Sequence, residues 1–267
     1  MWWLAAAALA QDGTIANAEL PSEDVPLEVD ETETKLTAEL GATFASGNAV
    51  FYAINGGADL RHRWKKNRFS VPALFNLGQA IPDLDGSGTL DEEERESGLT
   101  ENARRVLVEP RYDRFLSERD SLFLLVGVLH DPFIGYDLRP HETIGYSRLL
   151  VDAEATELRV EAGFDWAQEF FVEGTDPRYQ NVFALRLLGA LDHAFSDSVS
   201  VQDTVEMYEN VVDLADFRLV NTLAFSSALS DNLTLKLSHK LLFDNVPVPG
   251  FRKTDQTTGV TLVATLL

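Results

Sequence analysis

The residues with the clearest chemical pattern lie in the twelve-residue stretch that begins at Asp83 and ends at Glu94. Its spacing matches an EF-hand calcium loop, which has oxygen donors at positions 1, 3, 5, 7, 9 and 12 and a glycine at position 6. The pattern places an oxygen donor at every ligand position: Asp83, Asp85, Ser87, the carbonyl of Thr89, Asp91 and Glu94. Ser87 is the one departure, since Asp or Asn is usual there. The stretch therefore predicts a Ca²⁺ site, the only cofactor expected of this chain.

The flanks of this loop do not predict the helix pair of a complete EF-hand. Pro72, Pro82 and a strand-like pattern before the loop argue against an incoming helix, and Gly98 ends any outgoing one. Without a helix pair, a sensor switch is not expected. We expect a loop stiffened by calcium or used for adhesion, with weak affinity of about 10⁻⁴–10⁻³ M. The alternative is an acidic, solvated loop that only resembles the pattern.

Other residues do not form a catalytic or metal-binding constellation. The histidines are dispersed, and none is spaced from another as metal ligands are: His62, His130, His141, His193 and His239. An outer-membrane lipid hydrolase would need a Ser/His pair on its lipid-facing wall. Ser147 and His141 share one predicted strand and represent that alternative. We expect no catalytic residues and no enzyme.

The elements that must carry these residues alternate apolar and polar side chains. Leu158, Val160 and Phe164, for example, alternate with Arg159 and Glu161. In a strand this alternation gives one apolar and one polar face. The polar faces are too charged for the core of a soluble sandwich, although an open soluble sheet with a solvated face is an alternative. Lipid outside and a polar lumen inside satisfy both faces, as in a transmembrane β-barrel.

Segments of this kind recur along nearly the whole chain. They are expected at 34–45, 49–63, 67–78, 102–115, 120–131, 138–151, 156–168, 180–195, 198–209, 216–229, 232–244 and 252–267. Short turns alternate with longer loops, which are expected at 79–101, 132–137, 169–179, 210–215 and 245–251. Only the connection 46–48 is short at a place where the alternation of short turns and long loops predicts a longer loop. The sequence thus predicts an all-β, antiparallel transmembrane β-barrel of about twelve strands, with termini and short turns in the periplasm.

The lumen of this barrel is expected to be lined by charges of both signs. The phase that turns apolar residues outward sends inward Asp59, Arg61, Arg105, Glu109, Arg111, Asp113, Arg159, Glu161, Asp165, Arg186 and Lys236. Neighbouring strands carry opposite charges, so these side chains can pair across the lumen. The segment 122–129 is apolar on both faces, which predicts contact with a loop or plug inside.

Composition limits the partners and the domain organisation. A formal charge of −21 argues against nucleic acid and against docking on anionic lipid, and the absence of Cys excludes disulfide and thiolate chemistry. Residues 1–10 resemble the end of a truncated signal peptide, with the small-x-small pattern Ala8-Leu9-Ala10. Residues 11–33 are predicted to be an acidic, disordered leader. Residues 34–267 form the barrel, with 79–101 inserted as the calcium-loop-like segment.

Four stretches carry a resemblance to a known family. They read LGATFASGN at 40–48, YDRFLSER at 112–119, LSDNLTLKLS at 229–238 and PVPGFRKTD at 247–255. In this order along 36–267 the chain resembles the YdiY-like, salt-induced outer-membrane protein family, a domain of unknown function. The resemblance implies an outer-membrane barrel but no activity. The chain departs from the pattern at 79–101, and it ends in Leu266-Leu267, where barrel-assembly signals usually end in an aromatic residue.

These observations predict a non-enzymatic barrel in the outer membrane of a Gram-negative bacterium, with a structural, envelope-stress or small-channel role. The expected partners are outer-membrane lipid, the barrel-assembly machinery and, for a channel, small solutes. An outer-membrane lipid hydrolase and a soluble periplasmic calcium-binding β-protein are the alternatives.

Overall fold

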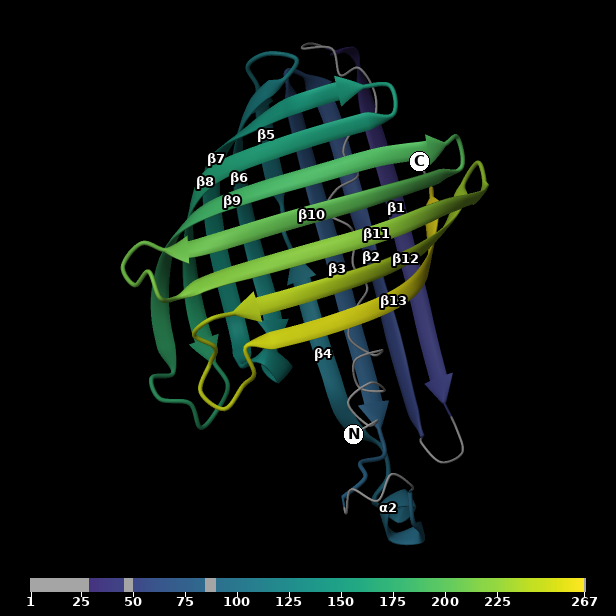
Figure 1. Ribbon diagram of the computed structural model, residues 1–267, viewed down its shortest axis with the longest axis vertical. Coiled ribbons are helices and arrows are strands. Elements are labelled where there is room, and N and C mark those ends of the chain that lie inside the picture. Colours follow the sequence, from purple (N-terminus) through teal and green to yellow (C-terminus); the bar gives the residue numbers. More distant parts are fainter. Residues whose placement is uncertain (1–28, 46–49, 85–89, 267) are drawn as a thin grey trace.

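In the computed structural model, which describes residues 29–45, 50–84 and 90–266, the alternating segments form antiparallel strands that close into a barrel (Figure 1). The strands are β1 (Val29–Ala45), β2 (Phe51–Lys65), β3 (Asn67–Ala80), β4 (Thr100–Val108), β5 (Arg111–Phe115), β6 (Asp120–Asp131), β7 (Tyr136–Ala153), β8 (Thr156–Phe171), β9 (Tyr179–Ser196), β10 (Val199–Asn210), β11 (Phe217–Ser230), β12 (Leu233–Asp244) and β13 (Thr254–Thr265). The barrel closes at β1, where Leu40 lies opposite Gly56 of β2 and Leu262 of β13.

Two of these strands, β4 and β5, together make one crossing of the wall. Both pair with β3 on one side and with β6 on the other. They are separated at Glu109 and Pro110, because proline has no N–H to donate to the ladder. The amide of Glu109 still donates to the carbonyl of Pro72, and the carbonyl of Pro110 accepts from Val126. Counted in this way, the thirteen strands make twelve crossings, which confirms the predicted barrel.

The first strand begins earlier than the alternation predicts. It starts at Val29 rather than Thr34, so the last residues of the predicted leader 11–33 belong to β1. The extension has a backbone partner, because β2 runs to Lys65 and places Arg63 opposite Glu33 and Lys65 opposite Val29. The rest of that leader, the predicted signal segment 1–10 and the predicted turn 46–48 lie outside the described residues.

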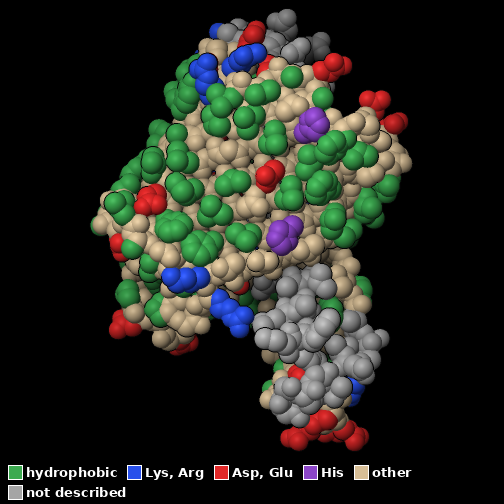
Figure 2. Space-filling view, viewed as in Figure 1, with side chains coloured by type: hydrophobic (Ala, Val, Ile, Leu, Met, Phe, Trp, Pro, Cys, Tyr) green, Lys and Arg blue, Asp and Glu red, His purple; other side chains and the backbone are tan. Residues whose placement is uncertain are grey.

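The two faces of the wall have the predicted phase. Leu40 and Ile144 are 61% and 66% exposed on the outside, whereas Asp113 and Asp165 on the inside expose nothing. Figure 2 shows hydrophobic side chains spread over the barrel wall, with acidic and basic ones mostly near its two ends. An apolar outer surface and a charged, enclosed lumen are what a bilayer selects in a barrel.

Short and long connections lie at opposite ends of the barrel, as predicted. The turns that join β2 to β3, β5 to β6, β7 to β8, β9 to β10 and β11 to β12 lie at one end, which we call the turn end. The opposite loop end carries the longer connections, including η1 (Pro132–Ile134) and α2 (Glu92–Ser97). In Figure 1, α2 lies beyond the strand ends at the bottom of the view. None of the helices in the described residues has the length and apolar character to cross a bilayer.

A small apolar cluster lies inside the loop end. Leu129, Tyr136, Phe171 and Val248 are buried together, and Leu107, Ile134 and Phe251 pack against them. Val248 comes from the loop between β12 and β13, and it fits against Gly135, where an added Cβ would lie 2.7 Å from Val248 Cβ. Leu129, near the loop end of β6, therefore meets a loop, as the apolar segment 122–129 predicts, whereas Phe123 of the same inward face lies against Arg111. We call this loop, 245–253, the plug loop.

Candidate functional site

The two cavities described below lie at different ends of the lumen. The loop-side cavity has a volume of about 180 Å³ and lies beneath the plug loop. The turn-side cavity has a volume of about 620 Å³ and lies among the short turns at 154–155 and 196–199. No described residue lines both cavities.

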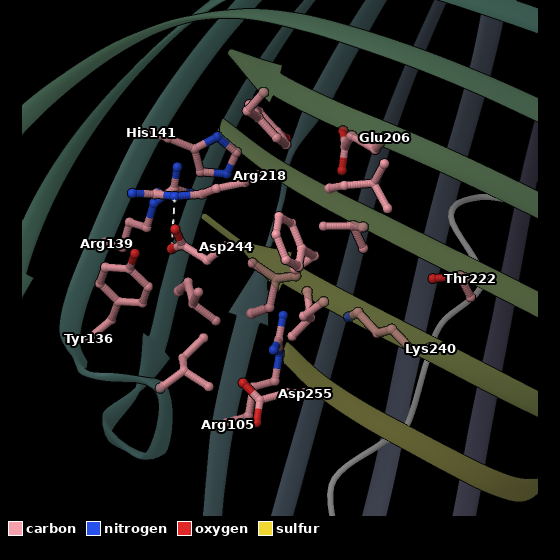
Figure 3. Close-up of a pocket in the computed structure, with 18 of the residues that line it drawn as sticks. Arg105, Tyr136, Arg139, His141, Glu206, Arg218, Thr222, Lys240, Asp244 and Asp255 are labelled. Carbon is pink, nitrogen blue, oxygen red and sulfur yellow. Dashed lines mark ion pairs between the residues drawn. The ribbon is translucent and has the colours of Figure 1, made fainter. Parts of the chain in front are cut away.

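The loop-side cavity combines a basic surface with an apolar one. Its basic side chains enter from β4, β7, β11 and β12 (Figure 3), and two more come from the plug loop. They are Arg105, Arg139, His141, Arg218, Lys240, Arg252 and Lys253. The apolar part includes Leu74, Leu107, Leu129, Ile134, Tyr136, Val220 and Leu242. Such a surface can contact an anionic group and an apolar body at the same time.

Carboxylates behind the cavity surface hold the arginines in place. Arg139 Nε lies 3.0 Å from Glu169 Oε1, and Arg218 Nη2 lies 3.3 Å from Glu169 Oε2. Arg105 Nη1 lies 3.3 Å from Asp131 Oδ2. Neither Glu169 nor Asp131 lines the cavity, and both are buried. The guanidinium groups therefore face the cavity, while these partners stand on its outer side.

His141 joins two strands that are not neighbours. Its Nδ1 lies 3.1 Å from Asp165 Oδ1 on β8, and its Nε2 lies 3.3 Å from Glu109 Oε1 at the junction of β4 and β5. To reach Glu109 the ring crosses β6 at Gly127. A Cβ at that position would lie 1.9 Å from His141 Nε2, so glycine makes room for the ring.

A network of ion pairs occupies the lumen beside the cavities. Arg111 of β5 donates to both oxygens of Glu161 of β8, at 3.0 and 2.7 Å, although β6 and β7 lie between these strands in the sheet. Arg186 bridges Glu161 at 2.8 Å and Glu206 at 2.5 Å. The ring of Phe123 lies under the guanidinium of Arg111, with 4.2 Å from Cζ to the ring centre. We call Arg111, Glu161, Arg186 and Glu206 the central network.

The turn-side cavity has the opposite charge character. Five carboxylates line it, Glu39, Asp59, Glu154, Asp192 and Asp197, against two cations, Arg61 and Lys236. Both cations have carboxylate partners in the cavity itself: Arg61 Nε lies 2.6 Å from Asp59 Oδ2, and Lys236 pairs with Glu39. The described lumen surface thus changes from basic at the loop end to acidic at the turn end.

Only part of the predicted calcium loop lies in the described residues. Asp85, Ser87 and Thr89 lie outside them, whereas Asp83, Asp91 and Glu94 lie inside. Asp91 caps α2, with its Oδ1 accepting from the amide of Glu94 at 2.8 Å. The Glu94 carboxylate accepts in return from the amides of Asp91, at 3.0 Å, and Leu84, at 2.5 Å.

The outgoing helix is short, as the sequence predicts. It ends at Ser97, and Gly98 follows with a φ of 79°. Within the described parts of the chain, three or more His, Asp or Glu side chains do not gather as metal ligands would. The Ca²⁺ site stays a prediction.

The Ser147 and His141 side chains do not form a hydrolase pair. Both are buried and face the lumen rather than lipid. They lie six residues apart on β7, which in a strand corresponds to about 20 Å. The arrangement required on a lipid-facing wall is therefore not formed by these two residues.

The inward charges predicted from the alternation are confirmed, but the sequence does not single out several residues that line the cavity or hold its arginines. Lys240 shares its strand and face with the predicted Lys236, so the same alternation could have found it. Glu169 falls in the predicted loop 169–179, because the predicted strand ends at 168 whereas β8 continues to Phe171. Arg139 and Arg218 lie near strand starts, where alternation gives the weakest signal.

Comparisons with known proteins agree with this architecture. The model of a family described as "Protein of unknown function, DUF481" matches residues 38–266, which is consistent with the YdiY-like resemblance. No protein with a curated description matches the chain.

Solved outer-membrane proteins are among the structures that match the chain. The NanC porin is 11% identical, with a TM-score of 0.50, over 87% of this chain and 100% of its own. An outer-membrane channel from Pseudomonas putida F1 is 12% identical, with a TM-score of 0.49, over 92% and 99%. At this identity the likeness concerns the fold alone.

Proposed function

Because this chain belongs to the family described as a protein of unknown function, DUF481, we propose its function from the barrel itself: a non-enzymatic outer-membrane channel for small solutes. One observation carries the proposal. The barrel is closed, apolar outside and charged inside, and its described lumen has cavities at both ends instead of a continuous hydrophobic core. A barrel that only sealed or braced the membrane would not need the unfilled space.

The location and orientation belong to the same proposal. We place the barrel in the outer membrane of a Gram-negative bacterium, with outer-membrane lipid around it and the barrel-assembly machinery as the partner that inserts it. The short turns and both strand termini, Val29 and Thr265, lie at one end, which in such barrels faces the periplasm. The loop-side cavity would then face the outside of the cell.

The channel proposal is tested by recording ion currents of the purified barrel in planar bilayers. Twelve strands enclose a narrow lumen that side chains largely fill, so the wild type should give small steps. Arg111→Gln removes the bridge across the lumen and should increase the conductance. In this variant Glu161 still forms an ion pair with Arg186, and Asp113 still forms one with Arg68, so the barrel should still fold.

Arg148→Gln is the matched control, because Arg148 is half-exposed and pairs with Asp120 near the turn end. It should leave the conductance unchanged. Electrical silence of wild type and Arg111→Gln, in protein whose gel mobility still shifts on boiling, would identify a purely structural barrel and overturn the proposal.

We also propose that residues 83–94 bind Ca²⁺. The sequence pattern carries this proposal. In the structure Asp91 and Glu94 form a capping box at the start of α2, and both carboxylate oxygens of Glu94 accept from backbone amides. Calorimetry on the whole refolded protein should give a binding heat at millimolar Ca²⁺. Asp83→Ala combined with Glu94→Gln should abolish it, and an unchanged heat would place the site elsewhere or remove it.

A further inference from the structure

We propose that the loop-side cavity binds a small organic carboxylate with an apolar body, of about the size of benzoate. This inference rests on the proposed channel function and names the class of solute that the channel recognises. Three properties of the cavity carry it: its volume, the direction in which its charged groups face, and its apolar surface.

The volume limits the solute to a small molecule. Pockets for drug-sized ligands measure about 300–1,000 Å³. The loop-side cavity, at about 180 Å³, is smaller than that. A dry cavity of about 150 Å³ in another protein binds benzene. One ring or a short acyl chain with a carboxylate therefore fits, whereas an oligosaccharide or a fatty acid does not.

The charges that face the cavity favour an anion. Six Lys and Arg side chains line it, against four carboxylates, among the described residues. Three of those carboxylates are already engaged, Glu109 by His141, Asp244 by Arg218 and Glu206 by Arg186. The partners of Arg105 and Arg139 lie behind the surface, which leaves their guanidinium groups turned toward the solute. Guanidinium groups are suited to bidentate contacts with a carboxylate.

The entrance continues this basic surface outward. Arg252 and Lys253 lie in the plug loop, line the cavity and are exposed. The structure shows no carboxylate within ion-pair distance of either side chain among the described residues, and Lys253 Nζ contacts Asn245 Oδ1 at 3.0 Å. Exposed cations at the mouth of a site increase the rate at which anions arrive.

The apolar surface separates an organic carboxylate from an inorganic anion. Leu107, Leu129 and Ile134 line the cavity together with the ring of Tyr136. Phosphate or sulfate would meet the basic groups but would bury none of this apolar surface. A neutral aromatic amide would bury it but would lose the charge-assisted hydrogen bonds.

The test is calorimetric titration of the purified full-length barrel in detergent micelles at low salt. Four probes are used: benzoate, benzamide, inorganic phosphate and benzylamine. Benzoate should bind at least about tenfold more tightly than benzamide or phosphate, a difference of about 1.4 kcal/mol. Benzylamine should not bind. Equal affinity for benzoate and phosphate would overturn the organic part of the inference, and equal affinity for benzoate and benzamide would overturn the anionic part.

Two comparable lysines show which of the two cavities holds the binding site. Lys240 and Lys236 are both buried, face inward from β12 and lie four residues apart, but Lys240 lines the loop-side cavity and Lys236 the turn-side cavity. Lys240→Gln should weaken benzoate binding by about tenfold. Lys236→Gln should leave it within about twofold, within the ordinary spread of such measurements. The reverse order would place the site in the other cavity and overturn the inference.

This result can be separated from the channel proposal. Binding in micelles needs no current, and the currents of wild type and Arg111→Gln need no benzoate. A barrel that conducts ions but fails to bind benzoate would overturn the solute class alone. A barrel that binds benzoate in the predicted order but carries no current would overturn the channel and leave the site.

Discussion

At the scale of single residues, the lumen is specified by pairs that only the three-dimensional register brings together. His141 reaches Glu109 because Gly127, on the strand between them, has no side chain. The sequence identifies all three as barrel residues, and its alternation predicted that Glu109 faces inward. It could not show that Gly127 lies beside His141, because pairing across strands depends on a register that alternation alone does not fix.

This contact gives a prediction about stability. Gly127→Ala places a methyl group into the His141 ring, so the ring must leave Glu109 or the strands must separate. We expect the free energy of unfolding in detergent to fall by about 1–3 kcal/mol, the usual cost of overpacking. Denaturant titration followed by gel mobility or tryptophan fluorescence measures the change.

Gly189→Ala is the control for this substitution. An added Cβ at Gly189 meets nothing within 4 Å, so stability should stay within about 0.5 kcal/mol of wild type. The double variant that combines Gly127→Ala with His141→Ala should lose less free energy of unfolding than the sum of the two single losses. Additive losses would show that the two residues do not interact.

At the scale of elements, the strands could be predicted well and their ends poorly. Alternation continues through each strand centre, whereas ends depend on how far the neighbouring strand runs: β1 begins at Val29, opposite Lys65 at the end of β2. Pro110 interrupts one crossing without ending it, because its neighbours β3 and β6 continue to pair on both sides. The plug loop could be inferred only indirectly, from the apolar inward face of β6.

The plug loop carries the second prediction. Val248 is 5% exposed against Gly135, whereas Val246 in the same loop is 49% exposed. Val248→Ser should release the loop, since burying a valine contributes about 1.5–3 kcal/mol. We expect faster cleavage of the loop by added protease on intact barrels, and larger current steps if the barrel conducts.

Val246→Ser in the same loop serves as the comparison and should behave as wild type in both measurements. Equal protease sensitivity of the two variants would mean that Val248 does not hold the loop in place.

At the scale of the whole molecule, the outer wall decides whether the barrel lies in a membrane. Phe164 is 45% exposed near the middle of β8, where lipid would surround it. Phe164→Arg should destabilise the inserted barrel by about 2–4 kcal/mol if the residue lies at the bilayer midplane. The free energy of folding into lipid vesicles, measured at increasing denaturant concentration, gives the size of this change. Leu214→Arg, in an exposed connection at the loop end, should cost little, and equal costs would contradict the predicted lipid belt.

The separation of turns and loops also predicts the orientation of the whole barrel. The chain contains no Cys, so single cysteines can be introduced without background. Asp176 and Asp213 lie in loop-end connections, and Asp231 lies in a turn at the opposite end. With the termini in the periplasm, cysteines at 176 and 213 should react with an impermeant maleimide on intact cells. A cysteine at 231 should react only after the outer membrane is opened. Labelling in the reverse order would mean that the barrel has the opposite orientation. The basic loop-side cavity would then face the periplasm and take its solute from there.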